Sequence, residues 1–172
     1  MNETLKTLTT RRSVRAYLPD QVKEDDLKQI LEAGTYAPTG MGAQSPVMVV
    51  VQDPETLRQL SRMNAAVMGG SGDPFYGAPT VIVVLADKNR GTSVEDGSLV
   101  MGNLMNAAAS LGVASCWIHR AREVFDTPEG KELLKKWGLS DNYIGVGNCI
   151  LGYAKDPLPQ PKPRKENYII RA

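Results

Sequence analysis

The chain has 172 residues, enough for one domain that buries roughly two-thirds of its unfolded surface. Its 20 lysines and arginines nearly balance its 19 aspartates and glutamates, and the net charge of +1 argues against nucleic-acid and membrane partners, so any anion site has to be local. The start Met1–Lys6 lacks the basic-then-apolar order of a signal peptide, and no apolar run approaches the roughly 18 residues of a membrane span, so we expect a cytoplasmic protein.

Helical spacing first occurs in Leu27, Ile30 and Leu31, which follow the acidic turn at 24–26, and Gly34 ends this helix. A buried strand at 47–51 follows, and then Asp53 and Pro54 open a helix that reaches about residue 64. The remaining elements are a loop at 68–74, a buried strand at 80–85, a helix at 93–111, a strand at 114–118, a helix from Thr127 to about Trp137 and a strand at 143–152.

The expected helix at 93–111 is apolar around most of its circumference, so it needs burial on several sides. Its own chain and a partner subunit are equally good candidates to cover it. The end of the chain also suggests a partner, because Tyr168–Ile170 is a short β-prone segment that predicts a strand docking on a sheet, its own or a partner's.

Alternating strands and helices predict an α+β or α/β sandwich, with helices covering a central sheet. A dinucleotide-binding Rossmann fold does not follow, because Gly145 and Gly147 lie inside a predicted strand and the third glycine of the fingerprint is missing. Cys116 and Cys149 lie in apolar stretches and are expected to be buried free thiols. One histidine and no Cys-x-x-Cys spacing give a metal site no support, and no Gly-x-Ser-x-Gly motif supports a hydrolase.

Two basic segments are suited to a phosphate: residues 11–15 near the start and residues 161–164 near the end. Arginine binds phosphate through a planar fork and lysine as a point charge. Taken alone, the first segment is more typical of a solvated helix end, and the second is typical of a charged, polyproline-like linker. A third segment, Ala37–Gln44, offers small residues and backbone against which a flat ring can lie.

Taken together, the three segments resemble the FMN-dependent nitroreductase family in its short form, and the resemblance covers nearly the whole chain. It implies a nitroreductase-like α+β fold with a central mixed sheet covered by helices, in an intertwined homodimer. It also implies a single FMN-binding domain over 1–172, with 157–172 as an extended C-terminal arm.

The resemblance also implies which residues bind tightly held FMN. Arg11, Arg12 and Ser13 correspond to phosphate and ribityl contacts, and Arg15 to a contact at the ring edge. The ring-packing turn of the other subunit corresponds to Pro38, Thr39, Gly40 and Met41, with Gln44 as a polar contact. A backbone amide at His119 or Arg120 corresponds to the contact with flavin N5, while a role for the His119 side chain stays open. Lys162 and Arg164 match the late phosphate-binding pair.

The chain departs from the family pattern at two places. Gly42 stands where the family often has an asparagine, so the acceptor side of the ring is expected to be more open. No basic residue occurs at 64–68, where many relatives place one near the ring, so Arg15 is expected to stabilise the reduced flavin alone.

The resemblance implies an enzyme in which NADH or NADPH gives hydride to flavin N5 and leaves. A flat electrophile, such as a nitroaromatic or a quinone, then binds on the same face of the ring and is reduced, which is a ping-pong cycle. The protein binds, orients and tunes the cofactor, so we assign no catalytic acid or base. Two other classes stay open: a protein that stores FMN or senses redox state without turnover, and a protein without flavin. A relative specialised for dehalogenation or flavin destruction is less expected, because such proteins usually carry lid segments for which this chain has no room.

Overall fold

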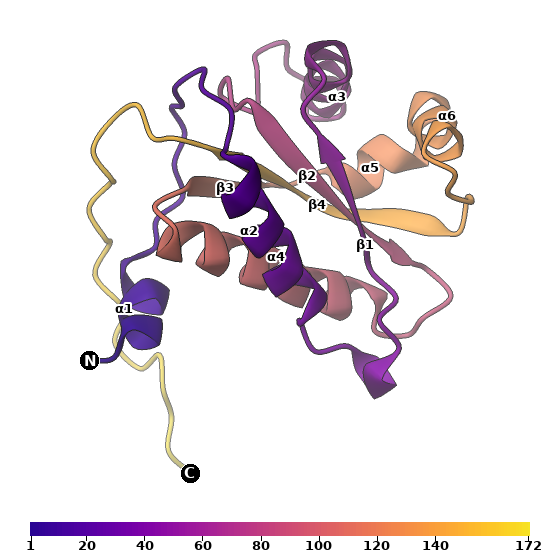
Figure 1. Cartoon of the computed structure of the whole chain (residues 1–172). Coiled ribbons are helices and arrows are strands. Elements are labelled where there is room, and N and C mark those ends of the chain that lie inside the picture. Colours follow the sequence, from indigo (N-terminus) through magenta and orange to yellow (C-terminus); the bar gives the residue numbers. More distant parts are fainter.

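A computed structural model describes residues 1–172. Its centre is a four-stranded sheet in the order β1-β2-β4-β3, shown in Figure 1. The strands are β1 (Val47–Val51), β2 (Thr80–Asp87), β3 (Ala114–Ile118) and β4 (Tyr143–Gly152). All three strand pairs are antiparallel, and the only parallel pairing is an isolated bridge between Ser13 and Ser115. The α+β class is confirmed, while the sheet within this chain is antiparallel instead of mixed.

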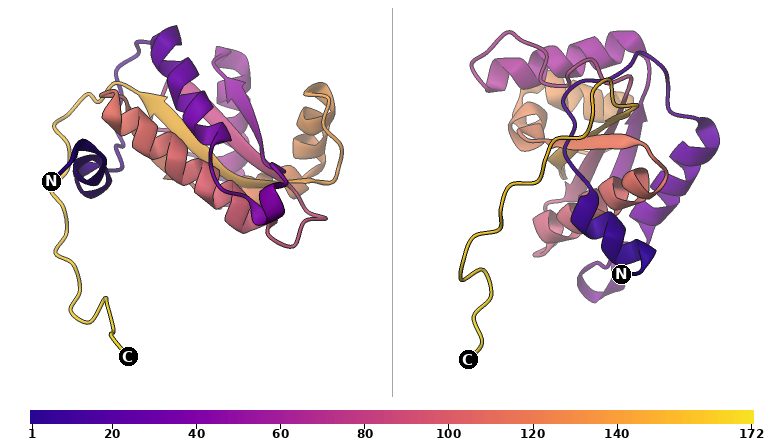
Figure 2. Two further views of the ribbon diagram at one scale, coloured as in Figure 1. Left: turned by 60° about the horizontal axis from the view of Figure 1, so that its bottom comes forward. Right: turned by 90° about the vertical axis from the view of Figure 1, so that its left-hand side faces the viewer.

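Helices cover both faces of the sheet, and the two views of Figure 2 show them as separate layers. On one face lie α2 (Glu24–Thr35) and α4 (Ser93–Ser110), with α1 (Glu3–Thr10) beside one end of α4. On the other face lie α3 (Pro54–Val67), α5 (Ala121–Asp126) and α6 (Pro128–Lys136). A short 3-10 turn, η1 (Gly40–Gly42), joins α2 to β1. This arrangement buries one apolar cluster on each side of the sheet.

The central strands are buried because their sequences are apolar on both faces. Val81 to Ala86 of β2 have no exposed surface, and β4 is buried from Ile144 to Gly152. Such two-sided burial is typical of a β-branched run without alternation. It leaves β1 and β3 as the edge strands, and β3 presents its free edge toward the Ser13 segment.

Local signals set the ends of several helices. The Asp53 carboxylate accepts a hydrogen bond from the N–H of Thr56 over 2.8 Å, with Pro54 in the first helical position, as predicted. Thr127 caps α6 in the same way through the N–H of Gly130, over 3.0 Å. The sequence did not predict α5, which has six residues and follows Arg120, a non-glycine residue with a left-handed φ of 77°.

The C-terminal arm leaves the body of the protein after Ala154, and residues 155–172 are exposed and contain no helix or strand. Figures 1 and 2 show this arm, in yellow, extending away from the sheet. The side chains of Tyr168, Ile169 and Ile170 are 69%, 81% and 84% exposed. The segment therefore pairs with no strand of its own chain, and its docking on a partner's sheet stays a prediction.

Both cysteines are buried and unpaired, as expected. No group of three or more His, Cys, Asp and Glu side chains comes together in a way that could hold a metal ion. None of the helices combines the length and the apolar character needed to cross a bilayer.

Candidate functional site

The residues after α1 run along the free edge of β3. The helix ends because Arg11 turns to an extended conformation, φ −52° and ψ 136°, after its N–H has donated to the Thr7 carbonyl oxygen. Ser13 then bridges to Ser115, and Val14 is buried in the core with 5% of its surface exposed. Because side chains alternate along an extended segment, burial of Val14 directs Ser13 and Arg15 to the other side.

This segment and the C-terminal arm form a groove of about 880 Å³, which we call the basic groove. It is lined by Leu8, Thr9, Arg11, Arg12, Ser13, Arg15, Pro159, Gln160, Pro161, Lys162 and Arg164. The structure thus brings together the two basic segments that lie about 150 residues apart in the sequence. The lining contains five cationic side chains and no carboxylate. Like charges gathered in this way repel one another unless an anion lies between them.

Two guanidinium nitrogens at the groove lack any partner. Nη1 of Arg11 and Nε of Arg12 are buried and make no hydrogen bond. Arg12 is held in place by its Nη1, which donates to the carbonyl oxygens of Thr9 and Arg11 over 2.9 and 2.8 Å. Arg164 folds back onto the arm and donates to the Lys162 carbonyl oxygen. Buried donors without an acceptor are costly, so an acceptor that reached these nitrogens would stabilise the two arginines.

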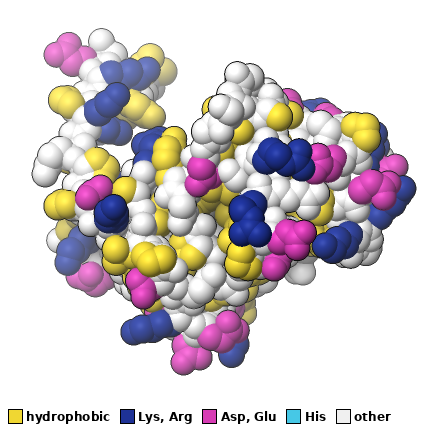
Figure 3. All heavy atoms as spheres, turned by 90° about the horizontal axis from the view of Figure 1, so that it is seen from above, with side chains coloured by type: hydrophobic (Ala, Val, Ile, Leu, Met, Phe, Trp, Pro, Cys, Tyr) yellow, Lys and Arg dark blue, Asp and Glu magenta, His cyan; other side chains and the backbone are white.

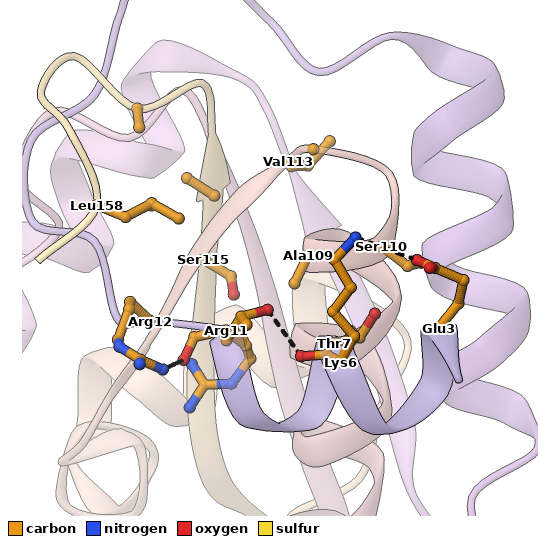
Figure 4. Close-up of a pocket in the computed structure, with 14 residues that line it drawn as sticks. Glu3, Lys6, Thr7, Arg11, Arg12, Ala109, Ser110, Val113, Ser115 and Leu158 are labelled. Carbon is orange, nitrogen blue, oxygen red and sulfur yellow. Dashed lines mark hydrogen bonds and ion pairs between the residues drawn. The ribbon is translucent and has the colours of Figure 1, made fainter. Parts of the chain in front are cut away.

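A second pocket of about 430 Å³ adjoins the basic groove, and Arg11 and Arg12 line both. Figure 4 shows these two arginines between Thr7 of α1 and Leu158 of the arm, with Ser115 of β3 above them. The pocket also reaches Ala109 and Ser110 in the last turn of α4. The basic residues therefore sit at the C-terminal end of α4.

His119 and Arg120 follow the opposite end of β3 from the basic groove. Ser115 contacts the Ser13 segment, and His119 lies four residues further along, about 13 Å at the rise of an extended strand. Both residues are exposed, and neither backbone N–H donates a hydrogen bond. The Arg120 side chain pairs with Glu123 over 2.7 Å, and this hydrogen bond lowers the pKa of the Glu123 carboxyl. Two free amide donors are thus available beside the strand.

The third predicted segment, the turn at 38–44, lies elsewhere in the chain. Pro38, Met41 and Gln44 are exposed, whereas Thr39 and Gly40 are half-buried. Met41 is fully exposed and has a left-handed φ of 56°. The N–H of Gly40 donates to the carboxylate of Asp96, in the first turn of α4, over 2.9 Å. The turn therefore belongs to the N-terminal end of α4.

The two halves of the predicted site are consequently far apart in one chain. Thirteen residues separate Asp96, which holds the turn, from Ala109, which lines the pocket beside Arg11, and this corresponds to roughly 20 Å of helix. The structure brings together Arg11, Arg12, Ser13, Arg15, Lys162 and Arg164, but it does not bring the turn to them.

The sequence did not predict three residues with a role in this geometry. Thr9 lines the basic groove near the end of α1, and its carbonyl oxygen accepts a hydrogen bond from Arg12. Ser115 pairs with Ser13 at the edge of β3, and Asp96 accepts the hydrogen bond from Gly40 in the turn. Neither of these two contacts has a local sequence signal, because each joins residues far apart in the chain.

The cationic side chains of the basic groove gather locally in a chain whose total charge is balanced. Over the body of the protein in Figure 3, lysines and arginines alternate with acidic side chains, while basic side chains gather on the projecting segment at the upper left. The basic groove thus differs from the general surface because no carboxylate lines it.

Comparisons with known proteins agree with this geometry. The sequence matches the nitroreductase family over residues 8–74 and 64–153. A candidate NADH dehydrogenase/NAD(P)H nitroreductase of Archaeoglobus fulgidus is 32% identical over 91% of this chain and 88% of its own. The FMN reductase [NAD(P)H] of Bacillus subtilis is 27% identical over 95% of this chain and 70% of its own.

Solved structures resemble the whole chain. A nitroreductase with bound FMN from Bacteroides fragilis has a TM-score of 0.92 and 33% identity, covering 100% of both chains. A nitroreductase with bound FMN from Desulfitobacterium hafniense has a TM-score of 0.89 and 28% identity, also over 100% of both chains.

Proposed function

The chain belongs to the nitroreductase family, and we propose that it is an FMN-dependent oxidoreductase that uses NADH or NADPH to reduce flat electrophiles. The observation that carries this proposal is the basic groove, with five cations, no carboxylate and two buried donors without partners. A phosphate monoester carries close to two negative charges and three strong acceptor oxygens at neutral pH. Such a phosphate group would supply both the negative charge that the five cations lack and acceptor oxygens for the unpaired donors.

The phosphate end of FMN is held by the two basic segments in this proposal. Arg11 and Arg12 have free buried nitrogens, and Ser13 adds a hydroxyl group on the same segment. Lys162 and Arg164 approach from the arm and complete the groove. Because all of these groups act at the phosphate, they bind the cofactor without taking part in the reaction.

The ring end then lies toward Arg15 and the end of β3. When bound, FMN supplies hydride transfer through N5. The free N–H groups of His119 and Arg120 can donate hydrogen bonds to the ring there, and Arg15 supplies positive charge at its edge. No side chain has to act as a general acid or base.

The turn at 38–44 completes the site from a second subunit. Pro38, Thr39, Gly40 and Met41 would pack on the partner's ring, with Gln44 as a polar contact. The separation of roughly 20 Å between the residue that holds the turn and the pocket beside Arg11 in one chain supports this arrangement. One chain also leaves many large apolar side chains exposed that a second subunit could cover, among them Leu5, Leu8, Met41, Val94, Leu99, Ile169 and Ile170.

Flat electron acceptors, such as nitroaromatics and quinones, fit a ring with an open face. Gly42 has no side chain, and no atom lies within 4 Å of the place where a side chain would begin. The acceptor and the nicotinamide would use this face in turn, which is a ping-pong cycle.

The cytoplasmic location stays a prediction.

The test is the visible spectrum of the purified protein after reconstitution with FMN, followed by anaerobic addition of NADH or NADPH. We expect a bound flavin spectrum that bleaches on reduction and recovers when a quinone is added. A bound flavin that stays oxidised with both nucleotides would favour the storage or sensing function. A protein that cannot bind FMN would contradict both.

Sedimentation of the FMN-loaded protein tests the composite site. We expect a homodimer at micromolar concentration. A monomer that retains FMN at the same concentration would contradict a site that needs two subunits.

A further inference from the structure

The carboxylate of Asp96 is buried, with 3% of the residue exposed, yet no lysine or arginine pairs with it. It accepts three hydrogen bonds instead. Its Oδ1 accepts from the N–H of Gly40 over 2.9 Å. Its Oδ2 accepts from the hydroxyl groups of Thr92 and Ser45, over 3.1 and 3.4 Å. A buried carboxylate without a counterion needs such donors, so the three hydrogen bonds to Asp96 stabilise it in its buried position.

The turn that Asp96 holds has a strained backbone. Met41 and Gln44 have left-handed φ values of 56° and 49°, which cost free energy in residues with a side chain. Within the turn, the Gln44 N–H donates to the Thr39 hydroxyl group over 2.9 Å. The only bond that joins the N-terminal side of this turn to α4 is the one from Gly40 to Asp96.

The fit between the turn and the helix leaves no spare room. A Cβ atom on Gly40 would lie 2.4 Å from the hydroxyl oxygen of Thr92, which itself donates to Asp96. The glycine therefore allows the backbone to approach α4 closely enough for its N–H to reach the carboxylate. Asp96, Thr92 and Gly40 act as one unit.

We propose that Asp96 is the positioning residue that holds the 38–44 turn in the shape in which it packs against the flavin of the second subunit. This inference rests on the proposed function for its flavin part. It does not make Asp96 a catalytic residue, because its carboxylate points to the turn's backbone within its own chain.

The test compares Asp96→Ala, Asp96→Asn and the matched control Glu95→Ala in the full-length dimer. Glu95 is an exposed acid in the same first turn of α4, so its loss removes the same charge from the helix end without touching the turn. Two quantities are measured: amide hydrogen exchange at Gly40 in the flavin-free protein, and the rate of FMN release.

We expect Gly40 exchange to be about tenfold to a hundredfold faster in Asp96→Ala, the factor expected when a hydrogen bond to a charged group is lost. FMN release should be about tenfold faster or more. Asp96→Asn keeps an acceptor oxygen for Gly40, so both effects should be smaller. Glu95→Ala should leave both rates unchanged.

Unchanged Gly40 exchange in Asp96→Ala would overturn the proposal, as would an equal change in Glu95→Ala. Faster exchange with unchanged FMN release would overturn the link to the flavin. If Asp96→Ala does not fold, Asp96→Asn decides the matter: a neutral acceptor forms a weaker bond, so exchange at the wild-type rate contradicts the proposal. If the parent protein binds no FMN, the proposed function fails, while the exchange experiment still tests the positioning role.

Discussion

Ser13 and Ser115 form an isolated parallel bridge, and the neighbouring Val14 N–H donates to the Ser115 carbonyl oxygen over 3.1 Å. This bridge attaches the basic segment to the free edge of β3. It therefore places Arg11 and Arg12 beside one end of the strand, while His119 and Arg120 follow the other end. One strand thus links the phosphate end of the proposed site to its ring end.

The arm residues of the basic groove should control FMN affinity and leave the chemistry unchanged. Lys162→Ala or Arg164→Ala removes a charge-assisted contact of about 1.5 to 3 kcal/mol, so the FMN Kd should rise roughly tenfold to a hundredfold. Turnover with saturating FMN should largely survive, because the phosphate lies far from N5. Fluorescence titration measures the Kd. Lys165→Ala removes the same charge outside the groove and serves as the control. An equal loss of affinity for FMN and for phosphate-free riboflavin would contradict the assignment.

Arg15 should tune the flavin's reduction potential. Arg15→Ala removes positive charge from the ring edge, so the potential should fall by a few tens of millivolts, equivalent to roughly 1 to 3 kcal/mol of charge stabilisation. The reductive half-reaction should slow accordingly. Spectroscopic redox titration of the FMN-saturated protein measures the potential, and Arg15→Lys, which keeps the charge, should retain most of it. An unchanged potential in Arg15→Ala would assign the tuning charge to another group.

Gly145 of β4 should be essential for the packing of this strand against the first residue of α5. A Cβ atom there would lie 2.3 Å from the carbonyl oxygen and 2.4 Å from the carbonyl carbon of Ala121, the first residue of α5. Backbone cannot move aside as a flexible side chain can, so Gly145→Ala should lower the free energy of unfolding by roughly 2 kcal/mol or more. The melting temperature should fall by roughly 4 to 8 °C. Gly72→Ala, at a place with no atom within 4 Å, should change it by less than roughly 2 °C. Equal melting temperatures for the two variants would contradict this account of α5.

The two thiols should be inert in the folded protein. Burial raises the pKa of the Cys149 thiol to about 12, and Cys116 is also buried. Only the thiolate reacts, so an aromatic disulfide reagent at pH 8 should detect no thiol in the native state and both thiols in denaturant. Rapid reaction of either thiol in the native protein would contradict its burial.

The same pKa shift predicts how stability changes at high pH. Above pH 9 the unfolded chain releases the Cys149 proton while the folded chain keeps it up to about pH 12, so the free energy of unfolding should fall across this window. Denaturant midpoints at pH 8 and pH 10 measure this fall. Cys149→Ala should show a smaller fall, because the titrating group is gone. An identical pH dependence in the variant would exclude Cys149 as a contributor.

Much of the fold could be predicted from local patterns. The bounds of β1, β3 and β4 agree with the apolar runs. The expected burial of β1 is wrong: it is an edge strand in which only Val51 is buried, because one of its sides has no neighbouring strand. The caps at Asp53 and Thr127 were predicted because a capping bond spans only three residues. The six residues of α5 were not, since their start depends on a left-handed Arg120 and on close contact with Gly145 in a distant strand.

The candidate site also has features that residue chemistry predicts and features that depend on contacts between distant residues. Residue chemistry makes the arginines and lysine of two segments candidates for binding a phosphate, because the guanidinium fork and the ammonium charge belong to the side chains themselves. Their meeting in one groove depends on the Ser13–Ser115 bridge and on the path of the arm, which are contacts between distant residues. Glu95 and Asp96 show this dependence on tertiary contacts. In the sequence they are two adjacent acids at a helix start, yet Glu95 faces solvent and Asp96 holds the N–H of Gly40, 56 residues away. Which acid is buried depends on the side of α4 that packs against the turn, and that packing exists only in the folded chain.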